Sequence, residues 1–280
     1  MLRIKKRAAV AAVAAITALS AVSLAAKAQA KDLLATVKER GELVIGTEFQ
    51  FAPFDFIENG KQAGLNLDLY TEIAKELGVK ARFIDLPWPS VLPGLEAQKF
   101  DIVAGPLIIT KQRMERYRFT PPIADATVAL LKSAKDDSIK TPQDIAGKKI
   151  GGGKASAQLA QLQEFVKTLP GETEVREYVD NNQAYADLAA GRIAAVGNSL
   201  PNIAYVAKQR PNVFSVVMPP FGKPVYFAYV GRKDDEAKSL MDAVDAALLK
   251  IKKDGRLGEI QKKWFGTTMD VPDSVTEPNA

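Results

Sequence analysis

Short apolar runs and amphipathic stretches alternate along the first part of the chain. Residues 42–46, 80–84 and 100–104 are apolar runs of strand length, which are typical of strands buried inside a sheet. Between these runs, residues 67–77 and 90–98 place apolar side chains at helical spacing. This alternation predicts an α/β unit with a parallel sheet that is covered by helices on both faces.

The residues that flank these segments predict where each one begins and ends. Asn66 and Ser90 stand at the starts of the two helices, and short polar side chains of this kind cap helix N-termini. Gly78 follows the first helix and is expected to end it. The third strand is expected to break at Gly105-Pro106. The residues after Thr267 are polar and proline-bearing, which predicts a loose tail.

The second half of the chain repeats the order strand, helix, strand, helix, strand. Its first helix is expected to begin near Ala155, directly after a short strand. The repetition predicts a second α/β domain. The strands are expected at residues 149–151, 174–178, 193–196 and 213–217, and the other helices at 182–190 and 201–210.

The chain is expected to cross between the two domains twice, at residues 126–132 and 218–228. These crossings divide it into a discontinuous first domain, residues 31–125 with 220–280, and a second domain, residues 126–219. Two domains joined in this way form a hinge around a cleft, and a ligand held by both halves favours the closed form. The elements that return to the first domain are a strand at 227–232 and helices at 237–253 and 256–265.

Candidate ligand-binding side chains follow the carboxyl ends of the first three strands, where open α/β sheets bind ligands. Arg113 follows the third strand, and its guanidinium offers a fork of donors that matches a carboxylate. Phe51 and Trp88 follow the other two strands and could form flat walls across a crevice. Glu48 could pair with a ligand cation. The alternatives are a solvated loop arginine and aromatic side chains that only pack in the core.

The first 30 residues have the pattern of a secretory signal peptide. Four basic residues between positions 3 and 7 precede an alanine-rich apolar stretch, and Ala28-Gln29-Ala30 matches an A-x-A cleavage site. We therefore expect Lys31 to begin a mature periplasmic chain, the alternative being an uncleaved anchor. No second stretch of about 18 apolar residues follows, so the mature protein is expected to be soluble.

The overall charge changes once this segment is set aside. It holds five of the 38 Lys and Arg residues and no acid, which leaves 33 residues of each sign. Because the remaining chain has no net positive charge, its composition gives no support to nucleic-acid binding. With neither cysteine nor histidine, it has no disulfide, no Cys or His metal ligand and no Ser-His or cysteine nucleophile. We expect no catalytic residue, no metal and no cofactor.

Several segments together carry a specific resemblance. They are GTEFQFAPFDFIENGKQAGLNLDLYTEIAKELGV, GLEAQKFDIVAG with the nearby ITKQR, and DGRLGEIQKKWFG near the carboxyl end. The chain resembles the family 3 periplasmic solute-binding proteins, the amino-acid receptors of ABC importers, over nearly all of its mature length. The resemblance implies the type II periplasmic binding protein fold, which has two Rossmann-like α/β domains joined by a two-strand hinge.

The resemblance also implies that one carboxylate is held from both domains. Arg113 would bind it from the first domain. In the family, a Gly-Thr pair at a helix N-terminus binds it from the second domain, and these positions fall on Ala155 and Ser156. Glu48 falls on a family position that is acidic in receptors for basic amino acids, which favours a cationic ligand end.

Two positions depart from the family pattern. Ile108 replaces a hydroxyl, although the carbonyl groups of Gly105-Pro106 remain as acceptors for an ammonium. In the stretch AGRIAAVGNSLP, Ser199 beside Asn198 replaces an aspartate that pairs with the α-ammonium of the ligand. A buried ammonium without a counter-charge is unfavourable. Either the ligand lacks an ordinary α-amino group or Glu48 serves the cation.

These features predict a monomeric periplasmic receptor. It would bind an amino acid or amino-acid-like carboxylate and deliver it to an ABC permease in the inner membrane. The alternatives are a dehydratase-type enzyme on the same fold, with Glu48 as acid or base, and a ligand-sensing module. The sequence contains no paired carboxylates and no nucleophile–base set that would favour the enzyme.

Overall fold

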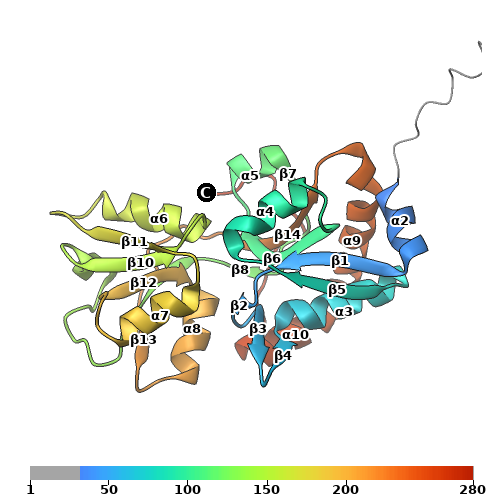
Figure 1. Cartoon of the computed structure of the whole chain (residues 1–280). Helices are drawn as coiled ribbons and strands as arrows, with labels where there is room; N and C mark the ends of the chain where they lie inside the picture. The colour runs from blue at the N-terminus through green and yellow to red at the C-terminus, as the bar shows by residue number, and fades with distance from the viewer. Residues whose placement is uncertain (1–31, 280) are drawn as a thin grey trace, which may run out of the picture.

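The computed structural model describes residues 32–279, which form two α/β lobes side by side (Figure 1). The predicted signal peptide lies outside these residues. Each lobe is built on its own sheet, and a small third sheet lies beside the first. Among the described helices, none combines the length and the apolar character that crossing a membrane requires.

The first sheet has the strand order β5-β1-β6-β14-β7, with β8 paired to β14. The three predicted strands β1, β5 and β6 are parallel, as expected. Strand β14 is antiparallel to β6 because the chain enters it from the other lobe. The strands are β1 (Glu42–Thr47), β5 (Lys80–Asp85), β6 (Ile102–Ile108), β7 (Tyr117–Phe119), β8 (Ala124–Asp125) and β14 (Tyr226–Arg232).

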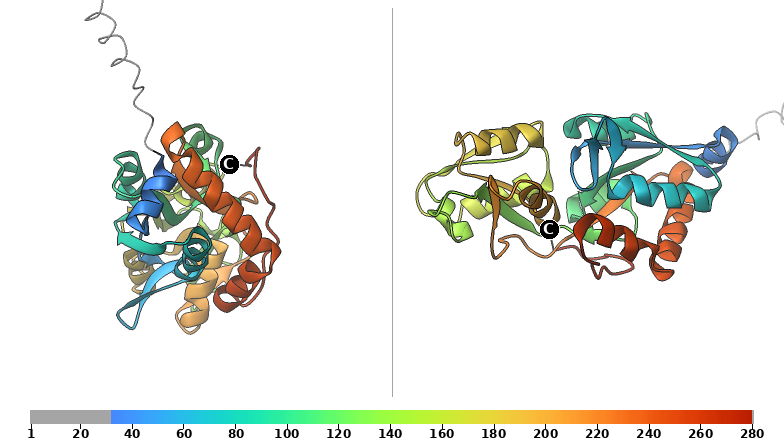
Figure 2. Two further views of the ribbon diagram at one scale, coloured as in Figure 1. Left: turned by 90° about the vertical axis from the view of Figure 1, so that its right-hand side faces the viewer. Right: turned by 90° about the horizontal axis from the view of Figure 1, so that it is seen from below.

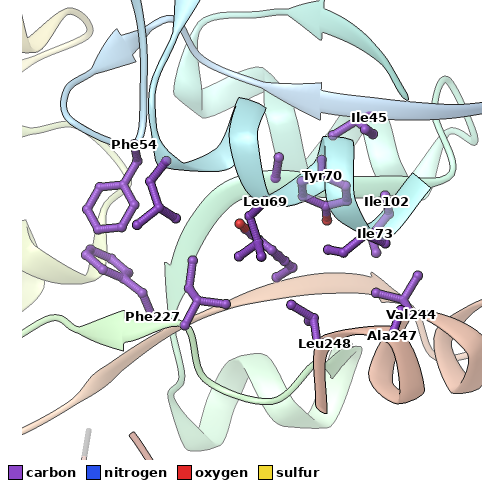
Figure 3. Close-up of a cluster of buried hydrophobic side chains, with 14 of the residues drawn as sticks. Ile45, Phe54, Leu69, Tyr70, Ile73, Ile102, Phe227, Val244, Ala247 and Leu248 are labelled. Carbon is purple, nitrogen blue, oxygen red and sulfur yellow. The ribbon is translucent and has the colours of Figure 1, made fainter. Parts of the chain in front are cut away.

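Helices cover both faces of this sheet. Leu43 and Ile45 of β1 point to one core cluster, and Val44 points to the other, because successive side chains of a strand face opposite sides. Figure 3 shows the larger cluster, where side chains of α3 and α9 meet the sheet. The helices of this lobe are α2 (Leu33–Arg40), α3 (Leu65–Leu77), α4 (Trp88–Glu96), α5 (Lys111–Arg116), α9 (Asp235–Lys253) and α10 (Arg256–Phe265).

The second sheet has the order β11-β10-β12-β9-β13. Apolar clusters on its two faces contain side chains of α7 and α8 in one case and of α6 in the other. The chain enters this lobe between β8 and β9 and leaves it between β13 and β14. Its elements are β9 (Val128–Ser133), η1 (Pro142–Ile145), β10 (Lys149–Gly153), α6 (Ala157–Val166), β11 (Glu174–Tyr178), α7 (Asn181–Ala189), β12 (Ala195–Ser199), α8 (Leu200–Gln209) and β13 (Phe214–Val217).

A three-stranded antiparallel sheet follows β1, and the apolar pattern did not predict it. It consists of β2 (Gln50–Phe51), β3 (Asp55–Glu58) and β4 (Lys61–Ala63). Gly64 joins this sheet to α3 with φ at 131°, and a Cβ there would lie 2.1 Å from the Phe54 carbonyl oxygen. The close approach requires glycine at this position.

The predicted break of the third strand at Gly105-Pro106 is wrong. Strand β6 continues to Ile108 and is buried throughout. Its pairing with β14 shifts between Ala228 and Val230, opposite this segment. The proline has no backbone N–H to donate, and an irregularity of this kind accommodates it without ending the strand.

Tertiary contacts also change two predicted helix starts. Gly64, not Asn66, precedes the first residue of α3. Asn66 lies inside the helix and donates from its amide to Asp55 at 2.7 Å and to the Ala104 carbonyl at 2.8 Å. Helix α4 begins at Trp88, so Ser90 lies in its first turn and does not cap it. Gly78 does end α3 in the left-handed conformation, as expected.

The prediction of a loose carboxyl-terminal tail is wrong. Val271 is 2% exposed and belongs to the large core cluster of the first lobe. Lys252 donates to the Val271 carbonyl, and Asn279 donates to the Pro224 carbonyl at 2.8 Å. Figure 2 shows this tail running back from α10 toward the junction of the lobes. The burial of Val271, the packing of Met269 against the same cluster and these hydrogen bonds together hold the segment in place.

Candidate ligand-binding site

A cavity lies where the two lobes meet, and residues of both lobes line it. The loops at the carboxyl ends of β1, β6, β10 and β11 contribute to its lining, as the rule for open α/β sheets predicts. Nine of the eleven candidate residues are among those that line it. The lining residues are Glu48, Phe51, Trp88, Gly105, Pro106, Ile108 and Arg113 from the first lobe, and Gly153, Lys154, Ser156, Gln158, Tyr178, Val179, Asn181 and Asn198 from the second.

Arg113 is positioned by a short helix where the sequence suggested a loop. Thr110 caps α5 by accepting from the Arg113 backbone N–H at 3.2 Å. The Arg113 guanidinium donates to the Ile108 carbonyl at 3.1 Å. Burial lowers its pKa to about 10. In residues 32–279 no carboxylate pairs with this guanidinium, so its remaining donors are available to an anion in the cavity.

Glu48 is the acid of the cavity lining. Only 4% of it is exposed, and its Oε1 atom is buried with no hydrogen-bond partner among the described residues. Burial raises its pKa to about 7, and repulsion from Asp180, Asp85 and Asp55 adds to this shift. The backbone N–H of Trp88 acts in the opposite direction and favours the carboxylate. A cation placed against Oε1 would restore the charged form.

The two predicted aromatic residues each combine core packing with a place in the cavity wall. Phe51 stacks on Phe54 with ring centroids 5.8 Å apart and meets Phe227 edge-on at 5.9 Å. Trp88 lies against β6, since a Cβ at Gly105 would be 3.0 Å from its ring. Its indole N–H also reaches the Ala155 carbonyl of the other lobe at 3.4 Å. Both rings therefore pack against neighbouring residues of the first lobe and also line the cavity.

The second lobe contributes the N-terminus of α6. The Ser156 hydroxyl caps this helix, accepting from the Leu159 N–H at 3.0 Å and donating to the Gly153 carbonyl at 2.7 Å. Ala157 and Gln158, the first two helical residues, have no hydrogen-bond partner for their N–H groups in the part of the chain that is described. Free N–H groups at a helix N-terminus favour an anion.

Two of the eleven candidates do not line the cavity. Ala155 is exposed and has a φ of 59°. Ser199 is fully buried, and its hydroxyl donates to the Asn202 side chain. Asn202 in turn donates to the Ala52 carbonyl at 2.7 Å, across the lobes. Ser199 thus belongs to a contact between the lobes rather than to the cavity surface.

Asn198 does line the cavity, but its amide group is engaged on both sides. Its Oδ1 accepts from the Ser199 backbone N–H at 2.8 Å. Its Nδ2 donates to the Tyr185 hydroxyl at 3.0 Å. The side chain is 4% exposed, so it forms a neutral and rigid part of the wall.

Six residues of the lining were missed by sequence reasoning, and all lie in the second lobe. Gly153, Lys154 and Gln158 surround the start of α6, whereas Tyr178, Val179 and Asn181 follow strand β11. The edge rule that placed Phe51 and Trp88 in the first lobe applies equally to the loop after β11. The same rule could therefore have predicted that the loop after β11 contributes residues to the cavity.

A second buried carboxyl group lies beneath the site. Asp55 is fully buried and accepts from the Thr47 hydroxyl and from the Asn66 amide at 2.7 Å. Tyr229 donates to the other side of that amide at 2.8 Å. Burial raises the Asp55 pKa to about 7. Residues 32–279 contain no group of three or more Asp, Glu, His or Cys side chains that could hold a metal ion.

The fold and the cavity define a bilobal α/β binding protein with its site between the lobes. Residues 43–267 match the model of the bacterial extracellular solute-binding proteins, family 3. The chain belongs to this family.

Curated relatives and solved structures agree with this assignment. The L-cystine-binding protein TcyJ of Escherichia coli K12 is 32% identical over 236 residues, which cover 84% of this chain and 86% of that protein. The ancestral amino acid-binding protein AncCDT-1, a precursor of cyclohexadienyl dehydratase, is 30% identical with a TM-score of 0.76, covering 84% of this chain and all of that one. The arginine-, lysine-, histidine-binding protein ArtJ of Geobacillus stearothermophilus is 26% identical with a TM-score of 0.74, covering 82% and 97%.

Proposed function

We propose that this protein is the periplasmic solute-binding receptor of an ABC importer. It binds an amino acid or an amino-acid-like carboxylate between its lobes and delivers it, as a monomer, to a permease in the inner membrane. Residues 1–30 would be removed on export. Membership of family 3 and the named amino-acid-binding relatives support this class of function.

The observation that carries the proposal is the Arg113 guanidinium in the cavity wall, which pairs with no carboxylate of residues 32–279. The free N–H groups at the start of α6 approach the same cavity from the other lobe. A carboxylate bound by both would stabilise the closed arrangement, because each lobe contributes part of its binding energy. We propose that residues 126–219 move as one domain and residues 31–125 with 220–280 as the other.

The experiment is calorimetric titration of the mature chain with a panel of amino acids and related carboxylates. Arg113→Ala should weaken binding by roughly 2–5 kcal/mol, because a buried charged group of the ligand loses its partner. Arg116→Ala is the matched control, since Arg116 lies on the same helix but is exposed and pairs with Glu96. Equal affinities of the two variants would remove Arg113 from the site.

A dehydratase-type activity is the second candidate, and Glu48 is the observation that favours it. A buried carboxyl group with a pKa near 7 is suited to act as a general acid or base. We favour the receptor because the lining has no second carboxylate and no histidine to work with Glu48. Turnover of a cyclic carboxylate by the purified wild type, lost in Glu48→Gln, would reverse this preference.

A further inference from the structure

The charges around the cavity limit what the ligand can carry. One acid, Glu48, and two bases, Arg113 and Lys154, line it. A basic α-amino acid brings two cations and one carboxylate, whereas Glu48 is the one acid in this lining, so one of the two cations would lack a carboxylate partner there. A ligand with a single cation and a carboxylate fits this wall better because each of its charges has an opposite partner.

The two opposite partners stand apart. Glu48 and Arg113 form no ion pair with each other, and they follow different strands, β1 and β6. Thr47 lies beside Gly105, since a Cβ at Gly105 would be 3.7 Å from its hydroxyl oxygen, so Glu48 leaves β1 near that point of β6. The Arg113 guanidinium bonds to the Ile108 carbonyl, three residues farther along β6. At about 3.3 Å per strand residue, this spacing favours a ligand whose cation and carboxylate are separated by a spacer.

Several neutral polar groups of the lining already have hydrogen-bond partners within the protein. The Ile108 carbonyl accepts from Arg113. The Ser156 hydroxyl donates to the Gly153 carbonyl, and the Asn198 amide is bonded on both sides. Neutral oxygens remain in the wall, but none of them offers a charge to an α-ammonium held next to the carboxylate.

In contrast to these engaged groups, the Glu48 Oε1 atom is free to accept a hydrogen bond. It is buried, belongs to a residue that lines the cavity, and has no hydrogen-bond partner within residues 32–279. An unsatisfied buried carboxylate oxygen is unfavourable until a donor reaches it. The ligand cation is the donor that also supplies the missing charge.

We propose that the ligand is a carboxylate with one cationic group at its far end and no α-ammonium, held by Arg113 at one end and Glu48 at the other. This inference rests on the proposed function and names the chemical class of its ligand. Phe51 and Trp88 contribute apolar wall for the hydrocarbon spacer between the two charges. A ligand without an α-ammonium needs no carboxylate at the positions of Asn198 and Ser199, so the neutral side chains there are compatible with it.

Two pairs of compounds that differ only in the α-amino group test the proposal. They are 6-aminohexanoate against L-lysine, and 5-guanidinopentanoate against L-arginine. Binding to the mature chain at pH 7 is measured by calorimetry, with hexanoate as the probe without a cation. We expect the compound without the α-amino group to bind at least tenfold more tightly in at least one pair. Glu48→Gln should weaken that binding at least tenfold and should not weaken the binding of hexanoate, which has no cation to lose.

Glu115→Gln is the matched control, because Glu115 is an exposed acid outside the cavity lining. Tighter binding of L-lysine or L-arginine than of its partner would overturn the inference and leave the proposed function intact. If other amino acids bind but none of the four compounds in the two pairs does, the inference is also overturned and the proposed function stays intact. No binding of any amino acid or carboxylate in the panel would overturn the proposed function itself.

Discussion

Replacing the buried Asp55 by asparagine should change how the stability of the protein depends on pH. Its carboxyl group is fully buried, and Oδ1 has no hydrogen-bond partner in the described part of the chain. The donors Thr47 and Asn66 favour the ionised form, but burial outweighs them and raises the pKa from 3.8 to about 7. The folded protein therefore keeps a proton on Asp55 over a pH range in which the unfolded chain has lost it.

The size of the effect follows from this shift. A difference of about three pKa units corresponds to about 4 kcal/mol of stability. Because the folded state holds the proton more tightly, the unfolding free energy contributed by Asp55 is highest below pH 4. It falls as the pH rises toward 7 and is constant above that value. In Asp55→Asn the side chain stays neutral, so this fall is absent.

The assay is urea denaturation of the ligand-free mature protein at several pH values between 4 and 8. We expect Asp55→Asn to gain about 4 kcal/mol relative to the wild type across this range. Asp137→Asn is the control, since Asp137 is exposed. If wild type and Asp55→Asn keep a constant difference from pH 4 to pH 8, Asp55 is ionised in the folded state and the reasoning from burial is refuted.

Three further predictions concern the backbone, the tail and the cavity. Gly64→Ala should cost more than about 3 kcal/mol in urea denaturation, because the added Cβ would lie 2.1 Å from a backbone oxygen. Gly60→Ala, where nothing lies within 4 Å, should cost about 1 kcal/mol, and equal losses would contradict the steric argument. Truncation before Val271 should lower the melting temperature, because it removes a buried side chain whose burial contributes about 1.5–3 kcal/mol, whereas a chain that ends at Asp273 should keep most of that stability. Trp88→Phe should remove most of the ligand-induced change in tryptophan fluorescence, whereas Trp264→Phe, which removes the other tryptophan, should retain it; the reverse result would place Trp88 outside the site.

Much of the fold was accessible from local patterns. Helices α9 and α10 lie within two residues of the expected ranges, because apolar side chains recur along one face of each. The candidates Glu48, Phe51, Trp88 and Arg113 were selected because they follow strands that end at one sheet edge. The structure places all four around one cavity. Their roles toward a ligand stay predictions until binding is measured.

Other features depended on partners that lie far away in the chain. The neighbouring residues predict that Asn66 caps a helix. In the structure its side-chain amide instead forms hydrogen bonds with Asp55, the Ala104 carbonyl and Tyr229. Ser199 reads as a ligand contact, yet its hydroxyl meets Asn202. No local rule assigns such partners, because the free energy of a hydrogen bond depends on which groups the fold brings together.

By itself, the sequence determined the two repeated α/β units, the equal numbers of basic and acidic residues after position 30 and the lack of cysteine and histidine. The tertiary structure alone decided that β6 continues past Pro106, that Val271 anchors the tail and that Glu48 faces the cavity with an unpaired oxygen. The physical reason is that periodicity records which side of an element is buried. Which groups meet there, and which remain without a partner, is settled only when distant elements pack.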